Sequence, residues 1–465
     1  MTDLKLPSAM AELRPALGEI VNQIQEQVPY FSILLSSKHG LQIKVDNREE
    51  QVNERPPSAG TVLSAFNGKT TYERAVSGFN RGKVQQATRE LVEGIDFPKT
   101  RHAEPEVQRS GDFATSMQID PLDLSIQEKL DRCRELHRRV KGRDARIVNV
   151  QIIYIEANEH AIFASKYADL AQRIQRVNLF IVVIVAGEDG HVQYDYLSKS
   201  GSGGWEVLNF TDEEIQEVVD GAVALLGAER IEPGEYQVIA SPGVGGTICH
   251  ESFGHGVETD MFLKKRARAA HFIDHIVGSS LVNIVDDPSR PGGFGSYFFD
   301  DEGLISTPTQ IVENGIFRRG ITDFYSATAL NIPRSANGRR QDYSRKAYAR
   351  MSNTYFEAGT STLEEMVSQV DHGMYLDKWS SGMEDPQGWG IQVTCHYGHE
   401  IKGGKITNRV FAPIGISGYV PDVLQSISAV SKVVIMDGGS CGKGHKESLP
   451  VASGGPHLLL KARLG

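Results

Sequence analysis

Hydrophobic residues in the first half of the chain follow two periods, one helical and one strand-like. They recur at helical spacing over Leu13 to Gln27, Lys83 to Gly94 and Ser125 to Lys141, which predicts three helices. Between these helices lie runs rich in Val, Ile, Tyr and Phe. The predicted strands are Phe31–Ser36, Leu41–Val45, Thr61–Phe66, Ala145–Glu156, Ala161–Ser165, Val177–Ala186 and His191–Ser198. Sequential hairpins of this kind favour an antiparallel sheet with flanking helices.

Turn and cap residues mark where these elements end. Lys38-His39-Gly40 and Glu188-Asp189-Gly190 are typical of turns, and the polar segment Phe97–Phe113 predicts an irregular connection. Thr211 precedes a Glu by three residues, which is the capping-box pattern of a helix that reaches about Gly227. Because a Pro-Gly pair follows at 233–234, we divide the chain into an N-terminal domain, 1–232, and a C-terminal domain, 233–465.

The second half of the chain is richer in β-prone segments. It opens with a predicted glycine-rich turn, Ser241–Gly246, and one short helical motif. The β-prone segments are Phe294–Phe299, Ile305–Glu313, Gly390–Tyr397, His399–Lys402, Lys405–Phe411, Ser431–Met436 and His457–Ala462. The sequence therefore predicts an α+β fold, in which an N-terminal α/β domain with an antiparallel sheet precedes a C-terminal β-rich domain.

Composition narrows the classes of protein that fit. Hydrophobic residues make up 40% of the 465 residues and charged residues 23%, which is typical of a globular chain. The net charge, 49 − 59 = −10, disfavours binding to nucleic acid or to an anionic membrane. No apolar run approaches the ~18 residues of a membrane span, and no secretory signal is visible, so we expect a cytoplasmic protein. Four irregularly spaced cysteines predict reduced thiols rather than a disulfide framework.

One short motif carries the chemistry of a metal site. His250, Glu251 and His255 lie within six residues, and the two histidines are five residues apart. On a regular helix this spacing would place the imidazoles about 140° apart with a rise of about 7.5 Å, too far for one ion. The sequence therefore predicts a bulged or broken helical turn, and Gly254, next to His255, favours such a distortion.

A catalytic zinc site takes about three protein ligands, so a further ligand must come from elsewhere. Cys441, in the predicted glycine-rich turn Asp437–His445, is our candidate because a thiolate suits zinc. Glu251 would then be the general base that activates a zinc-bound water. A buried and inert Cys441 is the alternative, and Cys249 is expected in the core or beside the ligands.

Two further readings of the cysteines remain open. Cys395, His396 and His399 form a second cluster in a β-prone segment, either as a second metal site or as ordinary strand residues. Cys441 with His445 could also form the nucleophile and base of a cysteine hydrolase.

Several separated motifs together resemble the TldD metalloprotease family, within the wider TldD/PmbA group. These motifs are the HExxxH pattern at 250–255, Phe299–Ser306, Val312–Ile316, Asn337–Arg340, Arg350–Tyr355, Cys441–Lys443 and Ser448–Val451. The similarity is dense from about Glu232 onward and looser before it. The sister TldE, or PmbA, group lacks the metal motif.

The resemblance implies a zinc-dependent peptidase of the cytoplasm that cleaves unfolded or extended peptides inside an enclosed dimer chamber. In the family pattern His250, His255 and Cys441 match the zinc ligands and Glu251 the general base. The partner is a second copy or a TldE/PmbA-like subunit. A non-catalytic peptide-binding or assembly subunit is the alternative function, and the acidic balance gives no support to the family's historical link with DNA gyrase.

Two basic segments are candidates for contact with substrate. Arg339 and Arg340 could bind a peptide carboxylate through their forked donors, or form ion pairs within the protein. The run Lys264–Arg268 fits a solvated face or, alternatively, a funnel for substrate.

Overall fold

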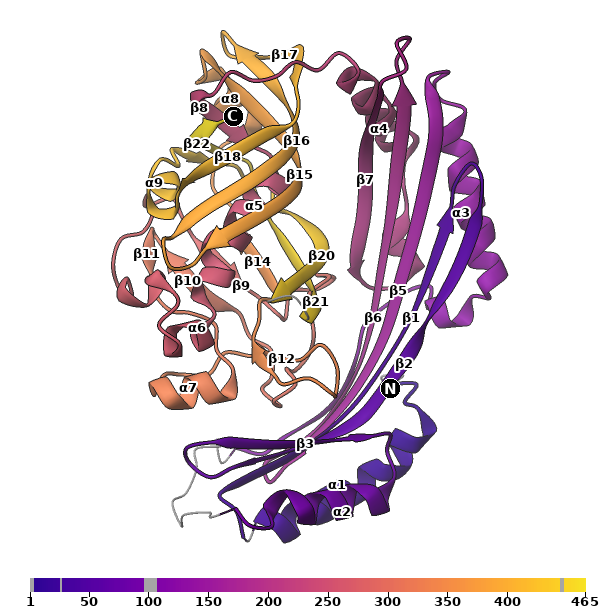
Figure 1. The fold of residues 1–465 in the computed structure, drawn as a ribbon, viewed down its shortest axis with the longest axis vertical. Coiled ribbons are helices and arrows are strands. Elements are labelled where there is room, and N and C mark those ends of the chain that lie inside the picture. Colours follow the sequence, from indigo (N-terminus) through magenta and orange to yellow (C-terminus); the bar gives the residue numbers. More distant parts are fainter. Residues whose placement is uncertain (1–3, 26, 96–106, 444–446) are drawn as a thin grey trace.

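The computed structural model describes residues 4–25, 27–95, 107–443 and 447–465. A long curved sheet forms the N-terminal half, and the C-terminal half lies alongside it (Figure 1). Among the described residues, no helix has the length and apolar character needed to cross a membrane. The predicted α+β class is confirmed, with the C-terminal half rich in strands.

The N-terminal sheet has seven strands in the order β3-β2-β1-β5-β6-β4, and β7 pairs with the free part of β6. All neighbours are antiparallel except β4 and β6. The strands are β1 (Tyr30–Val45), β2 (Glu50–Phe66), β3 (Thr71–Ser77), β4 (Arg109–Ala114), β5 (Ile147–Ser165), β6 (Ala168–Ala186) and β7 (Val192–Ser202).

Several strands are longer than the sequence predicts, and β1 and β5 each replace two predicted strands. The residues at 38–40 form a register shift inside β1 instead of a turn, and β5 runs unbroken through its polar middle. Glu156 and Asn158 in that middle are buried. Lys129 donates to Glu156 at 2.7 Å and Asn158 donates to Gln175 at 2.9 Å. Because these polar groups find partners, they do not break the strand.

Helices cover the ends of this sheet (Figure 1). They are α1 (Ser8–Gln25), α2 (Arg81–Val92), α3 (Ile126–Lys141) and α4 (Asp212–Leu225). The capping box at Thr211 and Glu214 is confirmed. Part of the predicted irregular connection, residues 96–106, lies outside the described residues, and β4 forms where the prediction had no strand.

The C-terminal half contains two larger sheets. One has the order β11-β10-β9-β14-β21-β20, and in the other β15, β8, β22, β18 and β16 close into a ring because β15 also pairs with β16. The strands are β8 (Gly234–Ala240), β9 (Ile284–Asp286), β10 (Thr309–Glu313), β11 (Ile316–Phe317), β12 (Gly338–Arg339), β13 (Tyr348–Ala349), β14 (Asn353–Phe356), β15 (His372–Asp385), β16 (Gly390–Lys402), β17 (Lys405–Phe411), β18 (Ile414–Tyr419), β19 (Ala429–Val430), β20 (Ile435–Lys443), β21 (Glu447–Gly455) and β22 (Leu458–Leu464).

Helix α5 lies in the middle of this half (Figure 1). The helices here are α5 (Pro242–Phe253), α6 (Thr259–Leu263), α7 (Phe324–Leu330), α8 (Leu363–Ser368) and α9 (Val420–Gln425). The predicted turn at 241–246 is wrong, because Pro242 opens α5 at a position where proline suits a helix start. A Cβ on Gly246 would lie 2.4 Å from the Gly454 nitrogen, so glycine lets α5 pack directly on β21.

The segment predicted as a strand at 294–299 is irregular and joins the two halves instead. Arg176 of β6 donates to the carbonyl oxygens of Phe294 and Ser296, each at 2.7 Å. The carbonyl oxygens of segment 294–299 therefore accept hydrogen bonds from a side chain of the N-terminal sheet rather than from a neighbouring strand.

Strand β7 makes several contacts with the C-terminal half. The Tyr196 hydroxyl donates to the Trp379 carbonyl at 2.5 Å, and the Gly438 N–H donates to Ser200 Oγ at 2.9 Å. Fully buried Asp195 pairs with Lys378 at 2.5 Å. One strand of the N-terminal sheet thus supports both β15 and β20.

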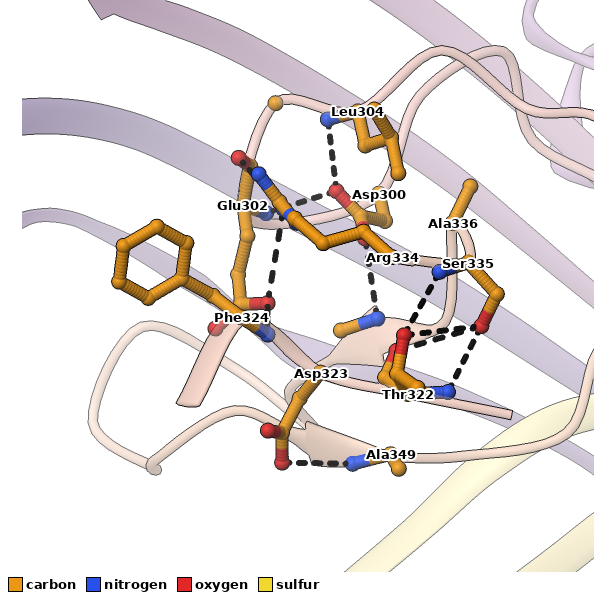
Figure 2. A network of polar contacts seen from close by, with 12 residues as sticks. Asp300, Glu302, Leu304, Thr322, Asp323, Phe324, Arg334, Ser335, Ala336 and Ala349 are labelled. Carbon is orange, nitrogen blue, oxygen red and sulfur yellow. Dashed lines mark hydrogen bonds and ion pairs between the residues drawn. The ribbon is translucent and has the colours of Figure 1, made fainter. Parts of the chain in front are cut away.

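Figure 2 shows a cluster of carboxyl groups in the C-terminal half, in which Asp300 and Asp323 are buried and Glu302 is partly buried. Asp300 accepts from the Leu304 and Gly338 nitrogens at 2.9 and 3.0 Å, and Glu302 accepts from the Phe324 nitrogen at 2.6 Å. Burial, reinforced by the neighbouring carboxylate of Asp323, raises the pKa of Glu302 to about 8. Burial therefore favours the neutral form of Glu302, although Arg334, 3.8 Å away, opposes this effect.

This raised pKa predicts a pH-dependent stability. An unfolded Glu ionises near pH 4.3, so the favourable neutral form in the fold is fully present below that pH and is lost as pH rises toward 8. We expect Glu302→Gln to flatten the fall in unfolding free energy between pH 5 and 8, by up to about 1.4 kcal/mol per pH unit. Urea unfolding at pH 5, 6.5 and 8 measures this, with exposed Glu54→Gln as control. Parallel curves for wild type and Glu302→Gln would contradict the assignment.

Candidate metal centre

The helix that carries the HExxxH motif ends inside the motif. Helix α5 stops at Phe253, Gly254 adopts φ −99° and ψ −82°, and His255 begins the short 3-10 helix η3 (His255–Val257). A Cβ at Gly254 would lie 1.9 Å from Met351 Sδ and 2.3 Å from the His250 carbonyl oxygen. The predicted broken turn is therefore confirmed, and only glycine fits at the break.

The break brings together three side chains of the kinds that can bind a metal. The rings of His250 and His255 are 5.0 Å apart and perpendicular, and Cys441 Sγ lies 3.1 Å from His255 Nε2. One ligand atom from each residue lies within 4.8 Å of the others, and no other group of this kind occurs in the described ranges. A tetrahedral zinc with two nitrogens and one sulfur holds such atoms about 3.5 Å apart. The donor set and its spacing therefore fit zinc.

Cys441 stands on a strand, not in the glycine-rich turn that the sequence predicts. Despite three nearby glycines, residues 435–443 pair continuously with β21, and Cys441 lies opposite Leu449. Burial raises the pKa of the Cys441 thiol, but contacts with His250 and His255 outweigh burial and lower it well below its usual value. The thiolate, which is the ligand form, is thus favoured.

A buried carboxylate holds the site together. Glu258 lies 3.4 Å from His255 Nδ1, 3.4 Å from Arg350 Nε and 3.1 Å from Lys443 Nζ. Burial opposes its ionisation, but contacts with Lys443, His255 and Arg350 lower the pKa of Glu258 to about 2. Arg350 also donates to the Cys441 carbonyl oxygen at 2.7 Å. Carboxylates in this position fix the tautomer and orientation of a metal-binding histidine.

These supporting residues are absent from the sequence-based prediction. Glu258 carries a weak signal, its spacing of three residues from His255. Arg350 and Lys443 begin or end motifs that carry the family resemblance, but no role follows from the motifs alone. Their contact with Glu258 depends on the fold.

Glu251 lines a pocket of about 730 Å³ in front of the three ligands. The pocket is bounded by α5, β15, β20 and the α6 region. Burial, with the adjacent Glu384 carboxyl group, raises the pKa of Glu251 to about 8. A cation held by the ligands would oppose both effects because it stabilises the carboxylate form.

Arg339 and Arg340 lie outside this pocket. Both are buried. Arg339 donates to the carbonyl oxygens of Met351 and Pro450, and Arg340 pairs with Glu73 at 2.8 Å. These contacts favour the alternative that both guanidinium groups bind within the protein. A contact with substrate stays a prediction.

The remaining cysteines form no further metal group among the described residues. Cys249 and Cys395 are fully buried, and burial raises the pKa of both thiols. His396 contacts the Tyr194 carbonyl oxygen at 2.8 Å, as a strand residue that packs on β7. His445, the proposed base of a cysteine hydrolase, lies outside the described residues.

Comparison with family models gives two matches. Residues 233–463 match the PmbA/TldA metallopeptidase C-terminal domain, and residues 119–229 match the PmbA/TldA metallopeptidase central domain. The chain is 30% identical over 341 residues to a metalloprotease of Methanocaldococcus jannaschii, covering 72% of this chain and 74% of that one. It is 29% identical over 467 residues to a metalloprotease of Methanothermobacter thermautotrophicus, covering 96% and 97%.

Solved structures share the fold. A Thermotoga maritima protein aligns with a TM-score of 0.78 and 19% identity, covering 98% of this chain and 100% of that one. TldE from Thermococcus kodakarensis aligns with a TM-score of 0.71 and 17% identity, covering 97% and 100%. At these identities the likeness concerns the arrangement of the chain.

Gly254 is the position where geometry constrains the centre most. We expect Gly254→Ala to cost about 1–3 kcal/mol of unfolding free energy and to lower bound zinc, because the added methyl displaces Met351 or the His250 backbone. Thermal unfolding and elemental mass spectrometry measure the two effects. Gly439→Ala, a matched change in the same pocket with open space around it, should leave both unchanged. Full zinc content in Gly254→Ala would contradict this account.

Proposed function

The chain belongs to the PmbA/TldA metallopeptidase family, and we propose that it is a zinc-dependent peptidase acting on unfolded or extended peptides. The observation that carries the proposal is the convergence of His250, His255 and Cys441 beside Glu251 in one pocket. An HExxxH pattern alone would be weaker support, because it supplies only two ligands. Here Cys441 of the distant strand β20 lies beside them as a third.

In this proposal His250, His255 and Cys441 hold the zinc, with Glu258 orienting His255. When bound, zinc supplies Lewis-acid chemistry, which polarises the peptide carbonyl and makes water more acidic. The Glu251 carboxylate accepts the proton of the attacking water and then donates it to the leaving amine. Its place beside His250, facing the pocket, supports this role.

The shape of the pocket supports extended substrates. Strand β20 ends its sheet among the described strands, and five of its consecutive residues, 439–443, line the pocket. A peptide added along this open edge would gain main-chain hydrogen bonds, which do not depend on side chains. We therefore propose that β20 binds the substrate as an additional strand.

We also propose that the subunit works in the cytoplasm as a dimer, with a second copy or a TldE/PmbA-like partner, around an enclosed chamber. Four free cysteines support a reducing compartment. Met383 on β15 and Ile435 on β20 are 66% and 50% exposed, which fits strands that a partner covers. Sedimentation velocity of the subunit alone and mixed with such a partner distinguishes the two assemblies.

Replacing the base separates binding of zinc from catalysis. We expect Glu251→Gln to keep about one zinc per chain but to lower peptide cleavage by at least ~100-fold, since the amide cannot accept the proton. Elemental analysis and a fluorescent peptide assay measure both. Exposed Glu235→Gln is the matched control and should cleave normally.

Two outcomes would contradict the proposal. Undiminished cleavage by Glu251→Gln would remove its assigned role. Absence of zinc from the wild type, even after zinc is added back, would favour a non-catalytic peptide-binding or assembly subunit.

Binding along β20 makes a prediction about the substrate backbone. N-methylation of the amides flanking the scissile bond should slow cleavage by at least tenfold, because it removes strand hydrogen bonds without changing side chains. Scrambled side-chain sequences should alter the rate less. Rates for methylated and unmethylated peptides are compared by mass spectrometry, and equal rates would exclude strand addition.

A further inference from the structure

The metal-site pocket has opposite charges at its two ends. Strand β20 runs past the centre from Asp437 through Cys441 to Lys443, all of which line the pocket. Asp437 lies at the start of α5, where a Cβ on Gly243 would be 2.7 Å from its carboxyl oxygen. At about 3.4 Å per residue, Asp437 lies about 14 Å along the strand from Cys441. This end of the pocket is acidic.

The other end gathers cations around one aromatic ring. The ammonium groups of Lys264, Lys346 and Lys443 each lie 5.6 Å from the centre of the Tyr348 ring. Arg266 joins Lys264, Lys443 and Tyr348 in lining the pocket. We call Lys264, Arg266 and Lys346 the basic rim, in which Lys264 and Arg266 line the pocket and Lys346 lies against Tyr348 beside it.

Carboxylates within the protein do not balance these charges. Asp260 pairs with both Lys264, at 2.9 Å, and Lys443, at 2.6 Å. Glu258 pairs with Lys443 but also contacts Arg350 and His255. Within the described part of the chain, no carboxylate lies within ion-pair distance of Arg266 or Lys346. The nearby Glu384 lies against Glu251.

Exposure leaves the rim free to contact a ligand. Arg266 and Lys346 are exposed, and the Lys264 side chain is 48% exposed even though Asp260 holds its tip. A guanidinium group offers a fork of donors that matches a carboxylate. An unbalanced guanidinium at the mouth of a peptide-binding pocket is therefore suited to an anionic group of the peptide.

We propose that the basic rim binds a carboxylate of the substrate and selects peptides that carry one close to the scissile bond. This inference rests on the proposed peptidase function. Lys443 lies two residues, or about 7 Å, beyond Cys441 along β20. The carboxylate therefore belongs two or three residues from the bond that is cut. It is either an acidic side chain or the C-terminal carboxylate.

Binding to zinc-loaded Glu251→Gln protein tests this without cleavage. Fluorescein-labelled decapeptides differ only by Asp or Asn at one scanned position, and a second pair differs by a free or an amidated C-terminus. By anisotropy we expect about fivefold tighter binding for Asp at one position, or for the free C-terminus, and a smaller ratio in 0.5 M NaCl. The arm that responds identifies the source of the carboxylate. Equal affinities within both pairs would overturn the proposal.

Variants assign the preference to the rim. Adding Lys264→Gln and Arg266→Gln to the Glu251→Gln protein should bring the ratio of the two affinities, with and without the carboxylate, close to one. Lys265→Gln, a neighbouring exposed lysine that does not line the pocket, should keep the ratio. A ratio unchanged in the double variant would overturn the assignment. Wild-type cleavage of the Asn peptide is measured in parallel, so loss of the preference is distinguishable from failure of the peptidase function.

Discussion

The metal centre depends on one buried ion, the Glu258 carboxylate. An uncompensated carboxylate at 1% exposure would be costly, so its presence requires cations on several sides. Two cations are Arg350 from the segment before β14 and Lys443 from the end of β20, and the His255 ring from η3 lies against the same carboxylate. A single electrostatic requirement thus brings three separate parts of the chain to one place, and two of the three carry or adjoin a metal ligand.

The same site is also supported from the N-terminal half. Strand β7 contacts β15 through Tyr196 and Asp195 and contacts β20 through Ser200. Residues of both strands line the pocket. The curved sheet is therefore a scaffold for the pocket as well as a separate layer of the fold, and changes in how the halves meet would alter the shape of the pocket.

The sequence predicts the local features of the fold but not those that depend on contacts between distant residues. The broken turn at Gly254 follows from the spacing of His250 and His255, and the capping box at Thr211 is a local pattern. The unbroken β5 could not be predicted, because its Glu and Asn residues are tolerated only when distant partners form hydrogen bonds with them. Lys129 and Gln175 are those partners. Helix α5 could not be predicted either. The glycines in its first turns are typical of a turn, and the reason for them, the close packing of β21, is visible only in the fold. The role of Glu258 required the fold.

The distance along the chain between the ligands has a consequence for the making of the protein. His255 and Cys441 are 186 residues apart, and Cys441 is placed by pairing of β20 with β21, which ends at Gly455. During translation His250, Glu251 and His255 therefore emerge long before Cys441. A growing chain cannot complete the proposed ligand set until β20 and β21 have both been made and have paired, so the proposed centre forms late in synthesis.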